Sequence, residues 1–327
     1  MAAKHYKKKL KTYSIGFEDD RFDETIYAKE AAARFNTNHI SKIVHSDMNK
    51  LWPLALYFCD QPHGDVSFVP TYEVANLASK DVKVVLTGDG GDEIFAGYDK
   101  YIDFFAKNNS LSNGYEKAYF EFSSLLTNNE KLEIYSNDLK TKFKDHDSFE
   151  FTRGFFDKYR EFDPINKVLA FDTHFLLSGN NLVKPDRMGM ACSLEARSPF
   201  LDYRVIEYGF SLPGEFKIHN NTSKYILKKA VENLIGKNLT HRKKQMFTVP
   251  IGEWFKGELA DFMKGILLSD QFLSRGIFSP DKVQELISNH IAGKKNHTRI
   301  LRALIAVELW YRIFIDQSKV KLPQDII

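Results

Sequence analysis

The stretch VVLTGDGGDEIFAGYDKY, from Val84 to Tyr101, combines a glycine-rich turn with a cluster of acids. The glycines and acids of this turn are Gly88, Gly90, Gly91, Asp89, Asp92 and Glu93. Such glycines let a nucleotide approach the backbone, and the carboxylates could hold Mg²⁺ against phosphates or bind an amino group. A purely structural turn is the alternative, because acids are also favourable in the first turn of a helix. Neither a P-loop nor a dinucleotide motif explains the pattern.

A second group of charged residues lies in KPDRMGMACSLEARSPFLD, from Lys184 to Asp202. Charges alternate here with Met and Leu, so some of them must lie near a core. One interpretation is a partly buried ion-pair network of Glu195, Arg197 and Asp202, because buried charges are normally paired. The other is a pocket wall in which a carboxylate orients a cationic or amino group.

A third group is the basic segment HRKKQMF, which begins at His241 and precedes Val249 and Pro250. A lysine in such a segment can stabilise the charge that develops on a departing pyrophosphate. An arginine can clamp a phosphate with two hydrogen bonds. A basic loop before a turn is the structural alternative.

The first half of the chain must position the glycine turn. Leu10–Phe17, His39–Val44 and Lys83–Leu86 read as strands, the last as a buried parallel strand because of its β-branched run. Helices are predicted after Asp23 and over 47–58 and 70–80. This alternation predicts the α/β class, with a parallel sheet and helices on both faces. Ligands bind beyond the carboxyl ends of such strands, where the glycine turn lies.

The second half of the chain has helical spacing and few strand signals. Helices are predicted near 114–145, 150–180, 203–210, 222–236, 255–268 and 297–316. A length of 327 residues suggests about two domains. We therefore predict an α/β core over residues 1–107 and a mainly helical remainder over 108–327, packed on that core.

Composition excludes several classes of protein. With 46 basic and 43 acidic residues the net charge is only +3, which argues against a nucleic-acid binder. No apolar run reaches the ~18 residues of a membrane span, and no apolar stretch follows the basic start as in a secretory signal. Cys59 and Cys192 lack metal-ligand spacing, and the histidines form no HExxH pattern, so no protein metal site is expected. We expect a cytoplasmic protein.

Taken together, the motifs are specific. TGDGGDEIFAGY, DRMGMACSLEARSPFLD, KYILKKAV and RKKQMF followed by VP, in this order, resemble the synthetase domain of glutamine-dependent asparagine synthetases. The resemblance runs from about Leu10 to Phe314. It implies an ATP-pyrophosphatase fold of the adenine nucleotide alpha-hydrolase type. It also implies that ATP, with Mg²⁺, adenylylates the side-chain carboxylate of aspartate, and that ammonia then attacks the aspartyl-AMP. Relatives that act on β-lactam precursors, peptides or sugar acids remain an alternative.

The resemblance implies roles for individual residues. Lys244 would stabilise the leaving pyrophosphate, Arg242 would assist it, and Asp89 would face the amino group of aspartate or the ammonia. The side chain of Asp89 is one methylene group shorter than that of the glutamate found at this position in many family members. The residues implied in binding ATP are Ile15, Gly88 and Gly90. The residues implied in binding aspartate or shaping its pocket are Asp92, Glu93, Glu195 and Arg197.

Three departures from the family pattern change the expectations. No SGGxDS phosphate loop precedes the strand at Leu10, so we expect the first strand, that loop and its helix to be missing from this chain. Ala2, where the glutaminase has its cysteine nucleophile, predicts no glutamine hydrolysis by this chain and a glutaminase domain or subunit as partner. Met246 stands where glycine is usual. An inactive binding subunit completed by a partner is therefore another alternative, and a homodimer is compatible with the pattern.

Overall fold

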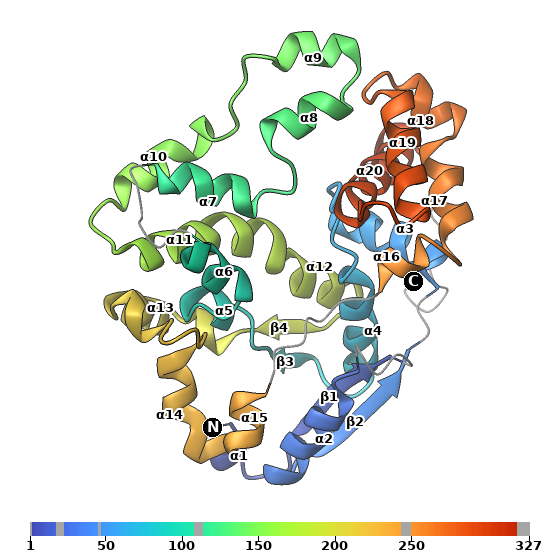
Figure 1. Ribbon diagram of the computed structural model, residues 1–327. Helices are drawn as coiled ribbons and strands as arrows, with labels where there is room; N and C mark the ends of the chain where they lie inside the picture. Colours follow the sequence, from blue (N-terminus) through green and yellow to red (C-terminus); the bar gives the residue numbers. More distant parts are fainter. Residues whose placement is uncertain (1, 18–22, 45–46, 108–113, 243–249, 319–327) are drawn as a thin grey trace.

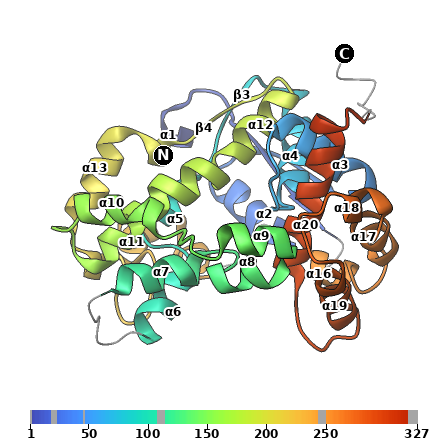
Figure 2. The same ribbon diagram turned by 90° about the horizontal axis from the view of Figure 1, so that it is seen from above.

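The computed structural model describes residues 2–17, 23–44, 47–107, 114–242 and 250–318. Figure 1 shows two pairs of strands low in the view, with helices above them and on both sides. In Figures 1 and 2 the helices from α16 to α20 gather on one side of the molecule, and α6, α7, α10 and α13 gather on the other. None of the described helices is long and apolar enough to cross a lipid bilayer.

The strands form two separate parallel pairs. β1 (Lys11–Gly16) pairs with β2 (Asn38–Ile43), and β3 (Val84–Leu86) pairs with β4 (Glu195–Arg197). The α/β class and the three predicted strands are confirmed. The single sheet with helices on both faces is not what the described residues form, because β1 and β3 are not hydrogen-bonded to each other. β4 was not predicted, since three residues with two opposite charges carry no strand pattern.

Two helices lie between β2 and β3, and the second of them packs on one face of both strand pairs. α2 (Thr25–Arg34) follows β1, and α3 (Met48–Cys59) and α4 (Phe68–Ser79) lead from β2 to β3. Asp23 accepts a hydrogen bond from the backbone N–H of Thr25, the first residue of α2, at 3.1 Å. The helices predicted over 47–58 and 70–80 are confirmed.

β3 is not the buried strand that its β-branched sequence predicts. Val84 and Leu86 are 45% and 62% exposed, while Val85 packs on a cluster that contains Ala75 and Ala78 of α4. The reason is that only one face of the β3–β4 pair is covered by described residues. A strand buried on both faces needs a layer on each side.

The remaining elements are helical, as expected for the second half. Those before β4 are α5 (Gly91–Ile94), α6 (Asp99–Lys107), α7 (Tyr115–Ser123), α8 (Asn128–Ile134), α9 (Asn137–Phe143), α10 (Glu150–Lys158), α11 (Pro164–Asp172), the π-helix Thr173–Asn181 and α12 (Val183–Ala191). Those after β4 are the 3₁₀ turns Pro199–Leu201 and Gly214–Phe216, α13 (Tyr203–Ser211), α14 (Tyr225–Ile235), α15 (Lys237–His241), α16 (Ile251–Trp254), α17 (Ala260–Leu267), α18 (Asp270–Ser274), α19 (Pro280–Ile291), α20 (Thr298–Trp310) and the π-helix Tyr311–Ile315. The short α1 (Ala2–His5) precedes β1.

The largest hydrophobic cluster joins the two halves of the chain. Ile15 of β1 and Trp52 of α3 lie in one buried cluster with Phe255, Met263 and Leu304 from the last third. A second cluster is rich in aromatic rings and lies among α6, α7, α10 and α11. The division at residue 107 stays a prediction, and the shared cluster shows how closely the two parts pack.

Candidate functional site

The glycine turn leaves the carboxyl end of β3 and is anchored to β4. The backbone N–H of Thr87 donates to the carbonyl of Arg197 at 2.9 Å, which extends the strand pairing into the turn. Gly90 has a φ of +83°, and a Cβ there would lie 2.2 Å from the side chain of Leu201. Glycine is required at this position for both reasons.

Asp89 is half-buried at the tip of the turn. Its carboxylate accepts a hydrogen bond from the hydroxyl of Thr87 at 2.6 Å. Its backbone carbonyl accepts one from the hydroxyl of Ser198, which directly follows β4. The first and second motifs are therefore joined at this point, with a carboxylate held in a defined position.

Asp92 faces a lysine that the sequence analysis did not single out. Lys224 Nζ lies 3.0 Å from Asp92 Oδ1, and both side chains are about one-quarter exposed. Lys224 has a φ of +52°, which is unfavourable for a lysine, and it precedes α14. The signal that could have found it is its place in the motif KYILKKAV, which it opens.

Glu93 lies beneath the turn and is only 1% exposed. Its Oε1 accepts hydrogen bonds from the Tyr98 hydroxyl and the Asn181 side-chain amide, both at 2.7 Å. Burial raises the pKa of Glu93, although these donors act in the opposite direction. The geometry favours a supporting role for this carboxylate, and its expected role in substrate binding stays a prediction.

Below Glu93, a buried carboxylate ties three helices together. Asp172 accepts hydrogen bonds from the hydroxyls of Tyr101 and Tyr119, both at 2.7 Å. Lys100 Nζ lies 2.6 Å from the same oxygen. Because α6, α7 and α11 supply these groups, the cluster fixes the helices that follow the glycine turn.

Glu195 and Arg197 pair with each other at 2.8 Å, but the pair is exposed. Their side chains are 52% and 64% accessible, so the expected partly buried network is wrong for these two residues. The reason is that both project from the uncovered face of the β3–β4 pair. Asp202 instead pairs with Arg204 at 2.8 Å and caps α13, and Arg204 lowers the pKa of Asp202 to about 2.

Lys184, at the start of the second motif, is a partly buried charge of that motif, with a side chain that is 16% exposed. Its Nζ donates to Asp65 at 2.7 Å and to the hydroxyl of Ser67 at 3.0 Å. Burial works against the charge on Asp65, yet Lys184 and Ser67 lower the pKa of Asp65 to about 2. This pair links α12 to the start of α4 and is a structural contact.

Ile15 and Arg242, which are predicted to bind ATP and to assist catalysis, line one cavity of about 460 Å³. β1, α2, α4, α14 and α15 surround it, and most of its lining is apolar. Arg242 Nη1 lies 2.7 Å from Glu24 Oε1, and the guanidinium sits 4.8 Å from the ring centre of Tyr27. Lys244 lies outside the described residues.

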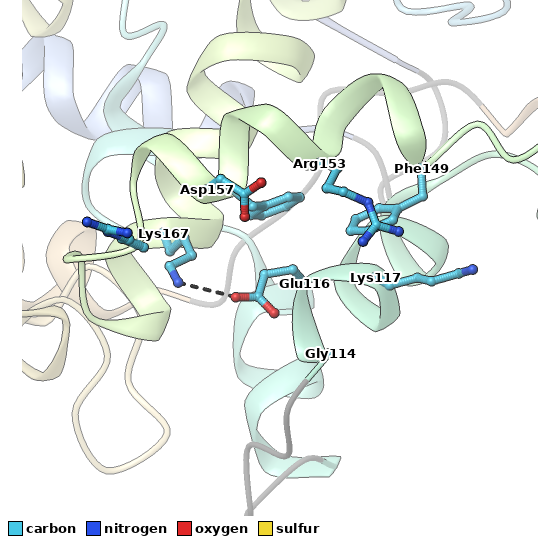
Figure 3. Close-up of a pocket in the computed structure, with 9 residues that line it drawn as sticks. Gly114, Glu116, Lys117, Phe149, Arg153, Asp157 and Lys167 are labelled. Carbon is cyan, nitrogen blue, oxygen red and sulfur yellow. Dashed lines mark hydrogen bonds and ion pairs between the residues drawn. The ribbon is translucent and has the colours of Figure 1, made fainter.

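A second cavity, of about 220 Å³, lies between α7, α10 and α11 (Figure 3). Glu116 in its wall pairs with Lys167 at 3.2 Å, and Lys117 and Arg153 add further charge. None of the predicted site residues lines it. Within the described part of the chain, no group of three or more His, Cys, Asp or Glu is placed to hold a metal ion.

Comparisons with a family model and with curated proteins point to the same family. The family model described as asparagine synthase matches residues 1–312. The chain is 30% identical to asparagine synthetase [glutamine-hydrolyzing] 1 of Bacillus subtilis, over 99% of this chain and 55% of that protein. It is 30% identical to a putative asparagine synthetase [glutamine-hydrolyzing] of Mycobacterium bovis, over 95% of this chain and 52% of that protein. The amidase chyE of Penicillium rubens is 21% identical over 85% of this chain and 49% of its own length. The chain thus spans about half the length of the curated relatives it matches.

Proposed function

Because the chain belongs to the asparagine synthase family, we propose that it provides the ATP-dependent, amide-forming half of asparagine synthesis. In this reaction the side-chain carboxylate of aspartate attacks the α-phosphorus of ATP, and pyrophosphate leaves. Ammonia then attacks the activated carbonyl, and AMP leaves with the electron pair of the broken bond. A cytoplasmic location suits this chemistry, because ATP and aspartate are available there.

The observation that carries the proposal is the meeting of three motifs at the carboxyl end of β3. Asp89 and Asp92 come from the glycine turn, Ser198 comes from the end of β4, and Lys224 opens α14. Segments far apart in the sequence therefore place carboxylates and a cation around one turn. Strand carboxyl ends are also where open α/β sheets bind ligands.

The two carboxylates suit an amino-acid substrate. Asp92 already holds an ammonium group, that of Lys224, so the α-amino group of aspartate can be held by the same carboxylate. Asp89 is oriented by Thr87 and half-buried, which allows it to accept a proton from, or to hold, the attacking ammonia. We keep Asp89 as the candidate for that role.

The cavity beside β1 suits an adenine base. Its apolar walls and the ring of Tyr27 can bury a flat heterocycle, and Ile15 lines it as expected. Arg242 lies in the same wall, and its guanidinium could bind a phosphate while it stays paired with Glu24. Lys244, two residues further on, is the proposed donor to the departing pyrophosphate.

The carboxylates of the glycine turn suit Mg²⁺ that is bound together with ATP. Mg²⁺ prefers oxygen ligands and is usually held by one or two carboxylates together with phosphates, which requires no three-residue cluster. Asp92, whose implied role is beside the aspartate substrate or its metal, is the carboxylate that would hold it, while Asp89 keeps its proposed role toward the ammonia. When bound, the ion would neutralise phosphate charge, and the residues named above would orient the substrates.

The nitrogen donor is proposed from the relatives. Their names describe glutamine hydrolysis, so ammonia from a glutaminase domain or subunit is the expected supply. Free ammonium should replace it in a test, because the proposed chemistry needs only ammonia at the site.

The test is pyrophosphate release by the purified chain with Mg-ATP, aspartate and a high ammonium concentration. In an otherwise complete enzyme, with the polypeptide that carries the SGGxDS loop added, release that depends on aspartate, and that Lys244→Ala abolishes, is the expected result. One transition-state donor is worth about 2.7–4 kcal/mol, so the loss should be at least about 100-fold. Equal release with and without aspartate would reject the proposed substrate, and an unchanged rate in Lys244→Ala would reject the role of that lysine.

A second candidate function is the same ATP-dependent amide formation on a carboxylic acid other than aspartate. The relative named amidase chyE favours it, because that name does not specify asparagine synthesis. The short side chain of Asp89 also leaves room for a different substrate. Pyrophosphate release measured across a panel of carboxylic acids distinguishes the two, since only the true acid should stimulate it.

A further inference from the structure

The second cavity, between α7, α10 and α11, has a buried lysine in its wall. Lys167 of α11 is only 8% exposed. Burying an ammonium group is costly unless its donors are satisfied, and a lysine has three N–H donors. Within the described part of the chain, the only polar partner of Lys167 Nζ is Glu116 of α7, at 3.2 Å. Lys167 therefore keeps donors for a ligand in the cavity that it lines.

The position of this ammonium group is fixed before any ligand binds. The side chains of Lys167 and Glu116 are 10% and 23% exposed, so their ion pair is shielded from solvent. The ring of Tyr115 lies beside it, with its centre 5.6 Å from Nζ. A charged group that is already held in place loses little further freedom when a ligand binds.

The opposite wall of the cavity supplies a carboxylate. Asp157 of α10 lies across from Glu116 and Lys167 in Figure 3. Its side chain makes no hydrogen bond or ion pair with another residue that the structure describes. A carboxylate without a partner can accept hydrogen bonds from an ammonium group.

Arg160, just after α10, can close the cavity over an acidic group. It pairs with Glu161 at 3.3 Å, but the two side chains are 80% and 88% exposed. Because an ion pair so exposed contributes little free energy, the guanidinium can turn to a bound carboxylate at little cost. Its planar donors suit a carboxylate.

The charges around the cavity nearly balance, which indicates the class of ligand. The cations of its lining are Lys117, Arg153, Arg160 and Lys167. The acids that line it or pair with those cations are Glu116, Asp147, Glu150, Asp157 and Glu161. The site thus has no excess positive charge to attract a phosphate ester. A zwitterion suits it, because each of its charges meets an opposite charge in the wall.

Size and apolar surface narrow the choice further. A cavity of about 220 Å³ is smaller than the ~300–1,000 Å³ of pockets for drug-sized ligands, so the ligand must be small. Phe149 and Phe156 line the cavity beside the charged groups, with ring centres 6.0 Å apart. These rings can bury an aliphatic side chain.

From these observations we propose that the cavity binds a free α-amino acid with an aliphatic side chain. The carboxylate of the ligand accepts hydrogen bonds from Lys167 and Arg160, and its ammonium group donates to Asp157. Its side chain packs on Phe149 and Phe156. None of these residues belongs to the site around the glycine turn, so this is a second binding site for a small molecule.

The bound amino acid would connect α10 with α11. Asp157 lies on α10 and Lys167 on α11, and α11 ends at Asp172, the carboxylate below the glycine turn. Added contacts between two helices oppose the local opening that exposes their amides. Hydrogen exchange at the amides of α10 should therefore slow when the amino acid binds.

The test is isothermal titration calorimetry of the whole chain with L-leucine as the probe. We expect saturable binding at one site with a Kd below about 1 mM. Isocaproate lacks the amino group of leucine and isoamylamine lacks its carboxylate, so each should bind at least about tenfold more weakly. L-Serine keeps both charges but lacks the aliphatic side chain, and it should also bind more weakly.

Asp157→Asn is the decisive variant. Asp157 is exposed and unpaired among the described residues, so the fold should stay intact while leucine binding weakens at least about tenfold. Glu121→Gln, a carboxylate-to-amide change at an exposed position of α7, is the matched control.

Lys167→Met should also abolish binding, but it leaves the Glu116 carboxylate without its cation, so it needs a check of folding by circular dichroism. Lys158→Met, at an exposed position of α10, is its control.

Several outcomes would overturn the proposal. They are no binding of leucine, equal binding of isocaproate, isoamylamine or serine, and equal affinities of Asp157→Asn and Glu121→Gln. Unchanged hydrogen exchange in α10 at saturating leucine would also contradict it. The titration contains neither ATP nor aspartate, so its result is separate from the test of the proposed catalysis.

Discussion

Lys224 Nζ and Asp92 Oδ1 lie 3.0 Å apart, and this contact joins the start of α14 to the glycine turn after β3. The lysine adopts a left-handed backbone conformation to make it. Such strain of about 1–3 kcal/mol is retained where the surrounding structure requires it, often at functional sites. We therefore assign Lys224 a positioning role toward Asp92.

Lys224→Ala should lower the rate of pyrophosphate release by about 100-fold, because a carboxylate that shifts by ~1 Å no longer orients its substrate. The free energy of unfolding should change by no more than about 1 kcal/mol, since the pair is partly exposed. The exposed Lys229→Ala, on the same helix, is the control. If the two variants have equal KM and kcat, the positioning role is wrong.

Gly90→Ala should destabilise the protein by more than about 1 kcal/mol, because the site has a φ of +83° and Leu201 occupies the space of a Cβ. Gly265→Ala should have the opposite effect and increase the free energy of unfolding. It lies inside α17 with no atom within 4 Å of a new Cβ, and alanine stabilises a helix by roughly 0.5–1 kcal/mol. Urea unfolding of both variants checks the pair, and equal signs would contradict the geometry.

Asp172→Asn should cost about 3–5 kcal/mol in the free energy of unfolding, because it removes the partner of the Lys100 ammonium beside buried hydroxyls. Tyr119→Phe should cost less, about 1 kcal/mol, since it removes one hydrogen bond. The exposed Tyr208→Phe is the control. A loss in Asp172→Asn no larger than that in Tyr208→Phe would show that this cluster does not hold the helices together.

Glu93 should make the stability of the protein depend on pH. Burial raises its pKa above the ordinary value of 4.5, so the folded state binds more protons than the unfolded state in the range between the two pKa values. Stability should therefore fall as pH rises from about 4.5 through that range. Denaturant unfolding at several pH values measures this slope.

In Glu93→Gln the slope should flatten, because the amide oxygen still accepts from Tyr98 and Asn181 but carries no charge. Glu133→Gln, at an exposed position of α8, should leave the slope unchanged. A slope that persists in Glu93→Gln would assign the pH dependence to another group.

Local pattern was enough to locate many elements. The alternation over Leu10–Phe17 predicts β1, and the helical spacing before the glycine turn predicts α3 and α4, because these signals arise from each segment's own period. The order of the charged motifs was also enough to identify the family, since residue types at fixed positions are a property of the sequence alone.

Other features depended on which segments meet in space. β4 exists only because Glu195–Arg197 pairs with β3, and the exposure of Leu86 depends on which face is covered, which no strand pattern encodes. The contact of Lys224 with Asp92 likewise needs α14 to pack beside the turn. Period and composition report a segment's own preferences, whereas pairing, burial and side-chain contacts are decided by its neighbours in the folded chain.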